Sequence, residues 1–226
     1  MKFEEIGILN KKFEGEAPQD ILRYIISQGG PYLSCISSFG AESAVLLHMI
    51  SQIDKDIPVI FIDTRKHFSE TYLYKNRLID QFGFTQLITT FPSQIQQETL
   101  DLSGELHKSD PDGCCHFRKT LPMLQALRNF KYYITGRKKF QSEGRKELNV
   151  FEKRNTWINI NPLASYSKED LEIYFLRHDI PRHPLEEDGY PSIGCECCTN
   201  KCDNYREGRW AGSKKTECGI HVKTEI

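Results

Sequence analysis

The chain has 226 residues, which suits one domain with a full core and is too short for two large ones. Hydrophobic residues make up 38% and charged residues 27%, as in ordinary globular proteins, and the net charge of -1 argues against bulk binding of nucleic acid. The sequence shows neither an export signal nor an apolar run long enough to span a membrane, so we expect a cytoplasmic protein without a membrane anchor.

Helix-like and strand-like patterns alternate along most of the chain. Apolar periodicity and breaker residues predict these elements in chain order: helix 17–29, strand 32–37, helix 41–53, strand 57–63, helix 69–83, strand 85–91, helix 117–130, strand 132–136 and helix 167–180. Strands separated by helices favour an α/β fold with a doubly wound, mostly parallel sheet. We expect a single domain over residues 1–226, with an α/β nucleotide-binding core at 18–185 and an irregular, cysteine-bearing C-terminal extension at 186–226.

The first candidate site is the segment SSFGAES, residues 37–43, between a predicted strand and a predicted helix. Gly40 lets the backbone approach a ligand closely, and the start of the helix supplies free N–H groups. Hydroxyl donors come from Ser37, Ser38 and Ser43. The pattern predicts a phosphate cradle, and a serine-capped turn is the alternative. The segment is not a Walker A loop, because it lacks the lysine and the first glycine.

The eight cysteines favour metal binding or thiol chemistry over disulfides, because the sequence shows no export signal. Cys195 and Cys198 form a C-x-x-C, and the tandem pair Cys114 and Cys115 would complete a four-sulfur set. Neighbouring side chains on a helix diverge by about 100°, which favours an iron–sulfur cluster with separate irons over one zinc ion. A zinc site, reduced bystander thiols, and Cys197 as a competing ligand are the alternatives. No role is assigned to Cys35, Cys197 and Cys202.

These motifs, in this order, resemble the assimilatory adenylyl-sulfate (APS) reductases, the thioredoxin-dependent, iron–sulfur members of the APS/PAPS reductase family. The resemblance rests on SSFGAES, VIFIDT, CCHFRKTLP, NPLASYSKEDL, GYPSIGCECCT, REGRWAG and KTECGIH, which run along most of the chain. It implies a fold like that of the adenine nucleotide α-hydrolases, a 4Fe-4S cluster, and a nucleophilic cysteine in the motif E-C-G-[LI]-H. The cluster ligands would be Cys114, Cys115, Cys195 and Cys198, and the nucleophile would be Cys218.

Cys218 lies in a polar tail without a hydrophobic pattern. The resemblance implies that its thiolate attacks the sulfur of the substrate's sulfate group and expels AMP. The resulting S-sulfocysteine is then reduced by thioredoxin or glutaredoxin, with release of sulfite. A mobile tail suits a cysteine that meets first a nucleotide and then a protein reductant. Lys214, Lys215 and His221 would favour the thiolate, and Glu217 would oppose it. An inert cysteine on a frayed end is the alternative.

Several cationic residues match positions where the family binds anions, and an arginine can grip a sulfate or phosphate through two hydrogen bonds. The predicted substrate-binding residues are Ser37, Ser38, Phe39, Gly40, Ser43, Lys119, Arg137, Arg206, Arg209 and His221. Each cation taken alone would more often be a solvated surface charge.

The sequence departs from the family pattern at Arg65, where glycine is usual, and at Lys138 and Lys139, where arginines are usual. Cys197 stands where proline is common. A lysine keeps the charge of an arginine without its planar fork, so these changes bear on affinity and substrate preference while leaving the reaction class intact.

Three alternatives to APS reduction stay open. The same chemistry could act on the 3'-phosphorylated substrate PAPS, and Arg65 and the extra lysines are compatible with this substrate. The cysteine quartet favours APS, because PAPS-specific relatives usually lack the cluster. A nucleotide- or metal-binding module without turnover would not need Cys218, and ATP pyrophosphatase chemistry would not explain ECGIH. The sequence leaves the electron donor and the oligomeric state open, a homo-oligomer included.

Overall fold

The predicted α/β fold with a mostly parallel sheet is confirmed by the computed structural model, which describes residues 5–212, 215 and 217–220. Its six-stranded sheet has the order β3-β2-β1-β4-β6-β5, and all neighbouring strands are parallel except β5 and β6. The strands are β1 (Leu33–Ser37), β2 (Val59–Ile62), β3 (Leu87–Thr90), β4 (Tyr132–Ile134), β5 (Phe151–Arg154) and β6 (Trp157–Ile160).

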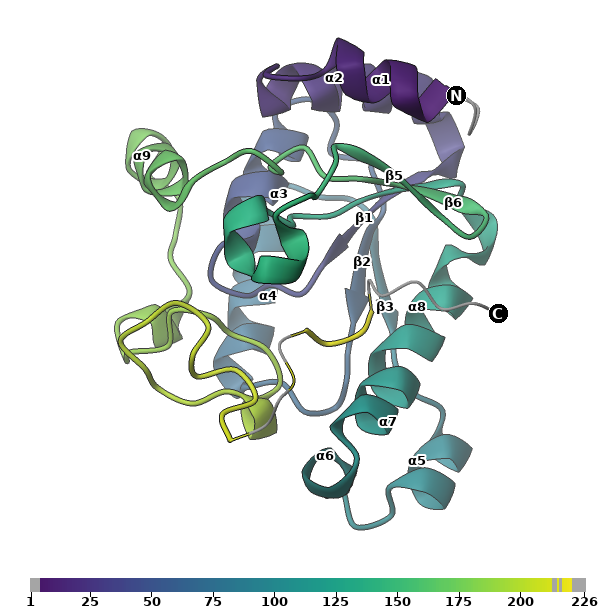
Figure 1. Ribbon diagram of the computed structural model, residues 1–226, viewed down its shortest axis with the longest axis vertical. Helices are drawn as coiled ribbons and strands as arrows, with labels where there is room; N and C mark the ends of the chain where they lie inside the picture. Colours follow the sequence, from purple (N-terminus) through teal and green to yellow (C-terminus); the bar gives the residue numbers. More distant parts are fainter. Residues whose placement is uncertain (1–4, 213–214, 216, 221–226) are drawn as a thin grey trace.

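Helices cover both faces of the sheet (Figure 1). They are α1 (Ile6–Lys12), α2 (Pro18–Gly29), α3 (Ser43–Ser51), α4 (Ser69–Phe82), α5 (Gln94–Leu100), α6 (Leu106–Ser109), α7 (Pro111–Cys115), α8 (Leu121–Ala126) and α9 (Lys168–His178). Side chains of β1 and β2 alternate between two apolar clusters. Cys35 and Phe61 belong to a large cluster with residues of α2, α3, α4 and α9, whereas Ile36 and Ile60 belong to a smaller one with residues of α8. This is the doubly wound arrangement that the sequence predicts.

The local signals of the sequence explain where several helices begin and end. Pro18 occupies the first turn of α2, where its missing N–H is not needed. Gly83 follows α4 in the left-handed conformation, with φ of 73°. The capping box expected at the start of α9 is present, because Ser167 and Asp170 exchange side-chain to backbone hydrogen bonds of 3.1 and 2.8 Å.

The structure contains helices and a hairpin that the sequence patterns do not predict. The helix expected at 117–130 begins earlier, because α7 runs through a π-helical turn, His116–Thr120, into α8. The wider turn ends just before Pro122, whose ring would clash with a preceding carbonyl in an unbroken α-helix. The β5–β6 hairpin turns at Asn155, which takes a positive φ of 52°.

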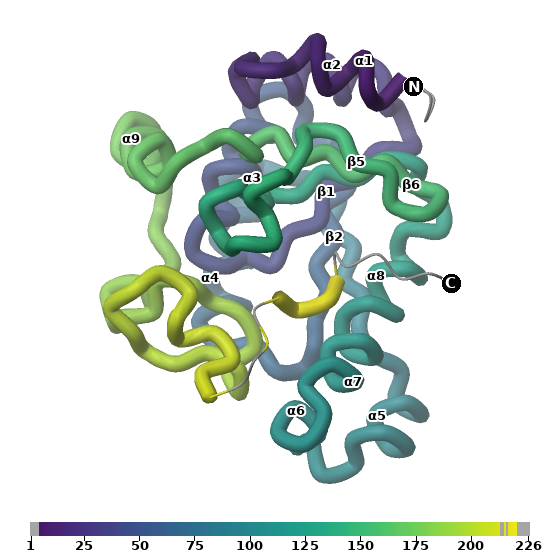
Figure 2. The backbone as a smooth tube through the Cα atoms, viewed as in Figure 1, coloured from purple at the N-terminus to yellow at the C-terminus, as the bar shows by residue number. Residues whose placement is uncertain are grey.

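The strand order changes direction between β1 and β4: from β1 the chain adds β2 and β3 on one side of the sheet, and it then adds β4 on the other side of β1. In open parallel sheets, ligands bind beyond the carboxyl ends of strands at such a switch point. Figure 2 traces the chain after α9 through a long irregular segment, whose last described residues lie between the labels of α4 and α8 in this view. No helix among the described residues is both long and apolar enough to cross a membrane.

Candidate active site

A cavity of about 220 Å³ lies at the carboxyl ends of β1 and β4, at the switch point of the sheet. Its wall is built from the segment after β1, the segment after β4 and parts of the C-terminal extension. Of the predicted site residues, the cavity brings together Ser37, Ser38, Gly40, Ser43, Lys119, Arg137, Arg206, Arg209 and Cys218. His221 lies outside the described residues, as does Lys214.

The SSFGAES segment turns sharply between β1 and α3. The hydroxyl of Ser37 accepts a hydrogen bond of 3.1 Å from the backbone N–H of Phe39, which has a positive φ of 50°. The ring of Phe39 does not line the cavity; it is buried and packs edge-on against Phe61, so it supports the turn from behind. A Cβ atom at Gly40 would lie 2.9 Å from the carbonyl oxygen of Ile193, so the close approach of this glycine is to the C-terminal extension.

Lys119 and Arg209 place positive charge near the predicted cluster cysteines. Burial lowers the pKa of Lys119, but the thiols of Cys195, Cys218 and Cys115 outweigh it and hold this pKa above its usual range. The guanidinium of Arg209 lies over the ring of Trp210, with 4.5 Å from Cζ to the ring centroid.

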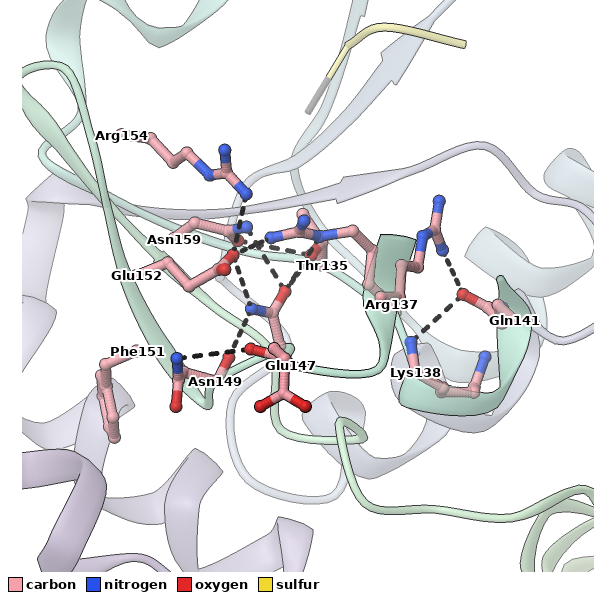
Figure 3. Close-up of polar contacts among 12 residues, drawn as sticks. Thr135, Arg137, Lys138, Gln141, Glu147, Asn149, Phe151, Glu152, Arg154 and Asn159 are labelled. Carbon is pink, nitrogen blue, oxygen red and sulfur yellow. Dashed lines mark hydrogen bonds and ion pairs between the residues drawn. The ribbon is translucent and has the colours of Figure 1, made fainter. Parts of the chain in front are cut away.

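Arg137 projects from the end of β4 into a network of buried polar groups (Figure 3). Its Nε donates to Oδ1 of Asn161 at 3.2 Å, and its Nη2 forms an ion pair with Glu152. Burial lowers the pKa of Arg137, and Glu152 partly offsets this. Neither Glu152 nor Asn161 is among the predicted site residues, although Asn161 is the first residue of the motif NPLASYSKEDL.

The unusual cations Arg65, Lys138 and Lys139 have different surroundings. Only Lys138 lines the cavity, and its Nζ is 2.7 Å from Oε2 of Glu42, with 2% of its side chain exposed. Burial lowers the pKa of Lys138, and Glu42 counteracts this. Arg65 is exposed, pairs with Asp63 at 3.4 Å and lies over the ring of Phe91. Lys139 is exposed, and neither it nor Arg65 lines the cavity that the described residues form.

The residue before Cys218 ties the tail to the cavity wall. The carboxylate of Glu217 accepts hydrogen bonds from Ser142 Oγ at 2.7 Å and from Arg145 Nη2 at 2.6 Å, and Arg206 lies 3.5 Å away. Burial raises the pKa of Glu217, but Arg145 and Arg206 outweigh it, so this pKa lies below its usual range. On the other side of Cys218, Ile220 packs against the apolar cluster of α8. The thiol is thus held at the cavity from both sides.

Sequence reasoning missed Arg145 and His67, which also line the cavity. Arg145 lies a few residues after the run Arg137–Lys139. Its position in the site becomes apparent only from its ion pair with Glu217, which is distant in the sequence. Nε2 of His67 lies 3.1 Å from the carbonyl oxygen of Ile62, which can only accept, so Nε2 carries the proton and Nδ1 is the acceptor. Burial lowers the pKa of His67 to about 4, so the ring is neutral at pH 7.

The predicted cluster cysteines lie beside the cavity, on α7 and on the segment after Gly194. Cys114, Cys115 and Cys195 are buried and Cys198 is half-buried. The two segments meet at Thr64, whose carbonyl accepts a hydrogen bond of 2.9 Å from Arg118 and whose hydroxyl contacts Cys195. Burial raises the pKa of Cys114 and of Cys115 to about 11, so a bare thiolate is unfavourable at either position.

Two neighbouring groups touch the second cysteine segment. The hydroxyl of Thr64 lies 3.2 Å from Sγ of Cys195, and the sulfur atoms of Cys197 and Cys198 are 3.7 Å apart. Within residues 5–212, 215 and 217–220, no three His, Cys, Asp or Glu side chains are grouped so as to hold a single metal ion.

Comparison with known proteins gives the same family from sequence and from structure. The profile of the phosphoadenosine phosphosulfate reductase domain matches residues 32–201. Adenosine 5'-phosphosulfate reductase of Mesorhizobium japonicum is 45% identical over 193 residues, which cover 84% of this chain and 76% of the relative. The protein of the same name from a Chelativorans species is 43% identical over 198 residues, which cover 86% and 80%.

Solved structures agree with these sequence matches. The crystal structure of phosphoadenylyl-sulfate (PAPS) reductase from Candida auris has a TM-score of 0.76 and 28% identity, and the match covers 88% of this chain and 98% of that one. An NH3-dependent NAD synthetase from Campylobacter jejuni has a TM-score of 0.51 at 14% identity, covering 84% and 79%. The second likeness concerns the fold alone.

Proposed function

The chain belongs to the phosphoadenosine phosphosulfate reductase family and is an oxidoreductase that acts on sulfur, and on that premise we propose that its substrate is APS, which it reduces to sulfite and AMP. One observation carries the proposal. The polar turn after β1, the cations Lys119, Arg206 and Arg209, and the tail thiol Cys218 line one cavity. The proposed anion cradle and the proposed nucleophile therefore share one cavity at the switch point of the sheet.

In the proposed reaction, the thiolate of Cys218 attacks the sulfur atom of the substrate's sulfate group. A sulfur–sulfur bond forms while the bond from sulfur to the bridging oxygen breaks, and AMP leaves with the electron pair. Lys119 lines the same cavity as Cys218 and supplies positive charge there. The cations of the cavity offset the negative charge that grows on the leaving phosphate, and Gly40 and the serine hydroxyls offer neutral donors to it.

The second half of the proposed reaction needs a dithiol from another protein, thioredoxin or glutaredoxin. Its thiolate attacks Sγ of the S-sulfocysteine and releases sulfite, and its second thiol then resolves the mixed disulfide and restores Cys218. The reductant is thereby oxidised by two electrons. Such a partner works in a reducing compartment, so we place the reaction in the cytoplasm.

The surroundings of the unusual cations favour APS over PAPS. A 3'-phosphate is a dianion that calls for additional cations near the ribose. Arg65 and Lys139 do not line the cavity of the described residues, and Lys138 is already bound to Glu42 and almost wholly buried. These three residues therefore add little to the attraction for a 3'-phosphate.

We also propose that Cys114, Cys115, Cys195 and Cys198 bind a 4Fe-4S cluster. Thiolates are the usual ligands of such clusters, and the burial of three of the four thiols fits a site that is closed to solvent. When bound, the cluster would supply positive iron centres that stabilise these buried sulfurs as thiolates. Lys119 follows the tandem cysteines on the same helical run and lines the cavity together with Cys218.

Sulfite release from APS and from PAPS, measured in parallel with thioredoxin and anaerobically purified protein, tests the proposed function. We expect sulfite from APS, with a kcat/KM at least about tenfold higher than from PAPS. Such a ratio corresponds to about 1.4 kcal/mol of discrimination between the transition states. A preference for PAPS would assign the other substrate. Absence of sulfite from both would leave a binding module without turnover.

A further inference from the structure

Arg137 lines the cavity while only 6% of its surface is exposed. Nε–H and one N–H of Nη2 form one edge of its planar guanidinium, and both are engaged, by Asn161 and by Glu152. Among the described residues, no hydrogen-bond partner meets the other edge, formed by Nη1 and the second N–H of Nη2, so this edge can bind an anion with two parallel hydrogen bonds. The orientation of the free edge is therefore decided by the two residues that hold the occupied edge.

Asn161 is itself held in one orientation. Its Oδ1 also accepts hydrogen bonds from Thr135 at 2.7 Å and from Asn159 at 3.3 Å, and its Nδ2 donates to the carbonyl of Asn149 at 2.8 Å. Asn159 and Asn161 have no exposed surface. Reversing the amide would put N–H groups against donors in a buried site, so the oxygen stays directed at Arg137.

Glu152 comes from β5, the antiparallel edge strand, where its register partner is Asn159 of β6. Its Oε2 pairs with Arg137 and also accepts a hydrogen bond of 3.1 Å from Arg154. The side chain of Glu152 is 19% exposed and that of Arg137 is 7% exposed, so the pair is only weakly screened by solvent.

We propose that Glu152 is a positioning residue that, together with Asn161, holds the guanidinium of Arg137 in one orientation. In that orientation the unoccupied edge of the guanidinium binds the phosphosulfate group of the substrate. This inference rests on the proposed function, because that function supplies the anion. It also assigns a task to the β5–β6 hairpin, which carries Glu152 and is followed directly by Asn161.

The clamp and a simple charge effect predict opposite signs. By Coulomb's law, a carboxylate close to an anion site weakens anion binding, so removal of its charge should tighten binding. If Glu152 instead holds Arg137 in place, its removal lets the guanidinium turn away, and binding should weaken. The sign of the change therefore separates the two roles.

The experiment compares AMP dissociation constants, measured by calorimetry, for the wild type, Glu152→Gln and Glu147→Gln. Glu147 is exposed on the neighbouring loop, so Glu147→Gln removes the same charge without touching the clamp. We expect the dissociation constant to rise about tenfold for Glu152→Gln, the scale of one charge-assisted hydrogen bond, and to change less than about twofold for Glu147→Gln. An unchanged or lower dissociation constant for Glu152→Gln overturns the clamp.

A double-mutant cycle separates positioning from general support of the fold. In an Arg137→Gln background, Glu152→Gln should cause no further loss of AMP binding, because the residue on which it acts is gone. An equal tenfold loss in that background would mean that Glu152 does not act through Arg137. Should Glu152→Gln fail to fold, Glu152→Asp can be used instead, because it keeps the charge but has a shorter side chain. The clamp predicts that this variant binds AMP more weakly, whereas a charge effect alone predicts unchanged AMP binding.

AMP titrations need no turnover, so the clamp and the reaction can fail separately. Sulfite release from APS together with an unaltered AMP affinity of Glu152→Gln would contradict the clamp alone. Weaker AMP binding by Glu152→Gln in a protein that releases no sulfite would contradict the proposed reaction alone.

Discussion

Single residues around Cys218 decide how a polar tail reaches an internal cavity. Glu217 is held by Ser142 and Arg145, and it also lies within ion-pair distance of Arg206, a proposed ligand of the phosphosulfate. The carboxylate of Glu217 therefore holds the tail with Cys218 at the cavity, and it also competes with the substrate anion for Arg206. Once AMP has left, release of Glu217 from these contacts would let the tail move and bring the S-sulfocysteine at position 218 to the reductant.

Glu217→Gln should separate these two effects. Without the carboxylate charge, AMP should bind several-fold more tightly, because a competing anion has been removed. Formation of the Cys218 adduct in a single turnover should slow by about tenfold, because the tail loses charge-assisted hydrogen bonds. Glu207→Gln, at an exposed position of the same segment, is the control and should change neither quantity. Equal weakening of AMP binding and adduct formation would contradict competition at Arg206.

At the scale of elements, the connected helix α7–π turn–α8 carries both tandem cysteines and Lys119. Replacing Cys114, Cys115, Cys195 or Cys198 by Ser should lower the iron and acid-labile sulfide of anaerobically purified protein, together with sulfite release, since each thiolate binds one iron. Cys202→Ser is the control, because Sγ of Cys202 accepts a hydrogen bond of 3.0 Å from the Gly208 N–H, a local contact. Loss of iron in Cys197→Ser but not in Cys198→Ser would reassign that ligand, and zinc without sulfide would contradict the cluster.

The same helix is joined to the segment after α5 by a buried ion pair. Arg118 and Asp101 are 2.7 Å apart, with 4% and 1% of their side chains exposed. Asp101→Asn should lower the free energy of unfolding by about 3–5 kcal/mol, because it leaves the Arg118 charge buried without a counter-ion. Asp20→Asn removes the exposed partner of Arg23 and should cost less than about 1 kcal/mol.

The pH dependence of that loss has a definite sign. Burial raises the pKa of Asp101, but hydrogen bonds from Arg118 and from the Leu106 N–H outweigh it and hold this pKa below its usual range. The stabilisation by Asp101 is therefore complete above the unfolded pKa of about 3.9 and is lost as the pH falls through the lower folded pKa. The difference in unfolding free energy between wild type and Asp101→Asn should shrink over that acid range in denaturant titrations. A difference that grows toward low pH would contradict this ion pair.

Elements that bury a continuous apolar pattern could be predicted from the sequence, and polar elements could not. Strands β1 and β2 and helices α2, α3 and α4 read as buried runs or amphipathic stripes, and their signals survive in the structure. No such apolar stripe is present in the hairpin strand FEKR or in the short helices α5–α7. These elements bury few apolar side chains, so hydrophobic periodicity does not reveal them. The clamp on Arg137 was missed for that reason: Glu152 lies on a strand without a clear period.

At the scale of the whole molecule, the motifs were predicted in order along the chain, and the fold brings most of them to one cavity. The sequence could not place partners that meet across long separations, such as Arg145 with Glu217 or Lys138 with Glu42. Lys138 shows why this matters, because the sequence offers it as an extra substrate cation and the structure engages it with a carboxylate. Only the three-dimensional contacts distinguish a cation that can bind substrate from one that is already paired with a carboxylate.

The central claim is that Cys218 is the nucleophile of the sulfur transfer. Mixing the protein with APS in the absence of reductant, followed by mass spectrometry of the peptide that contains TECGIH, tests it directly. We expect one sulfite group on Cys218 and one AMP released per active chain, discharge of the adduct as sulfite when thioredoxin is added, and no adduct in Cys218→Ser, which should still bind AMP. An adduct on another cysteine, or full sulfite production by Cys218→Ser, would contradict the account.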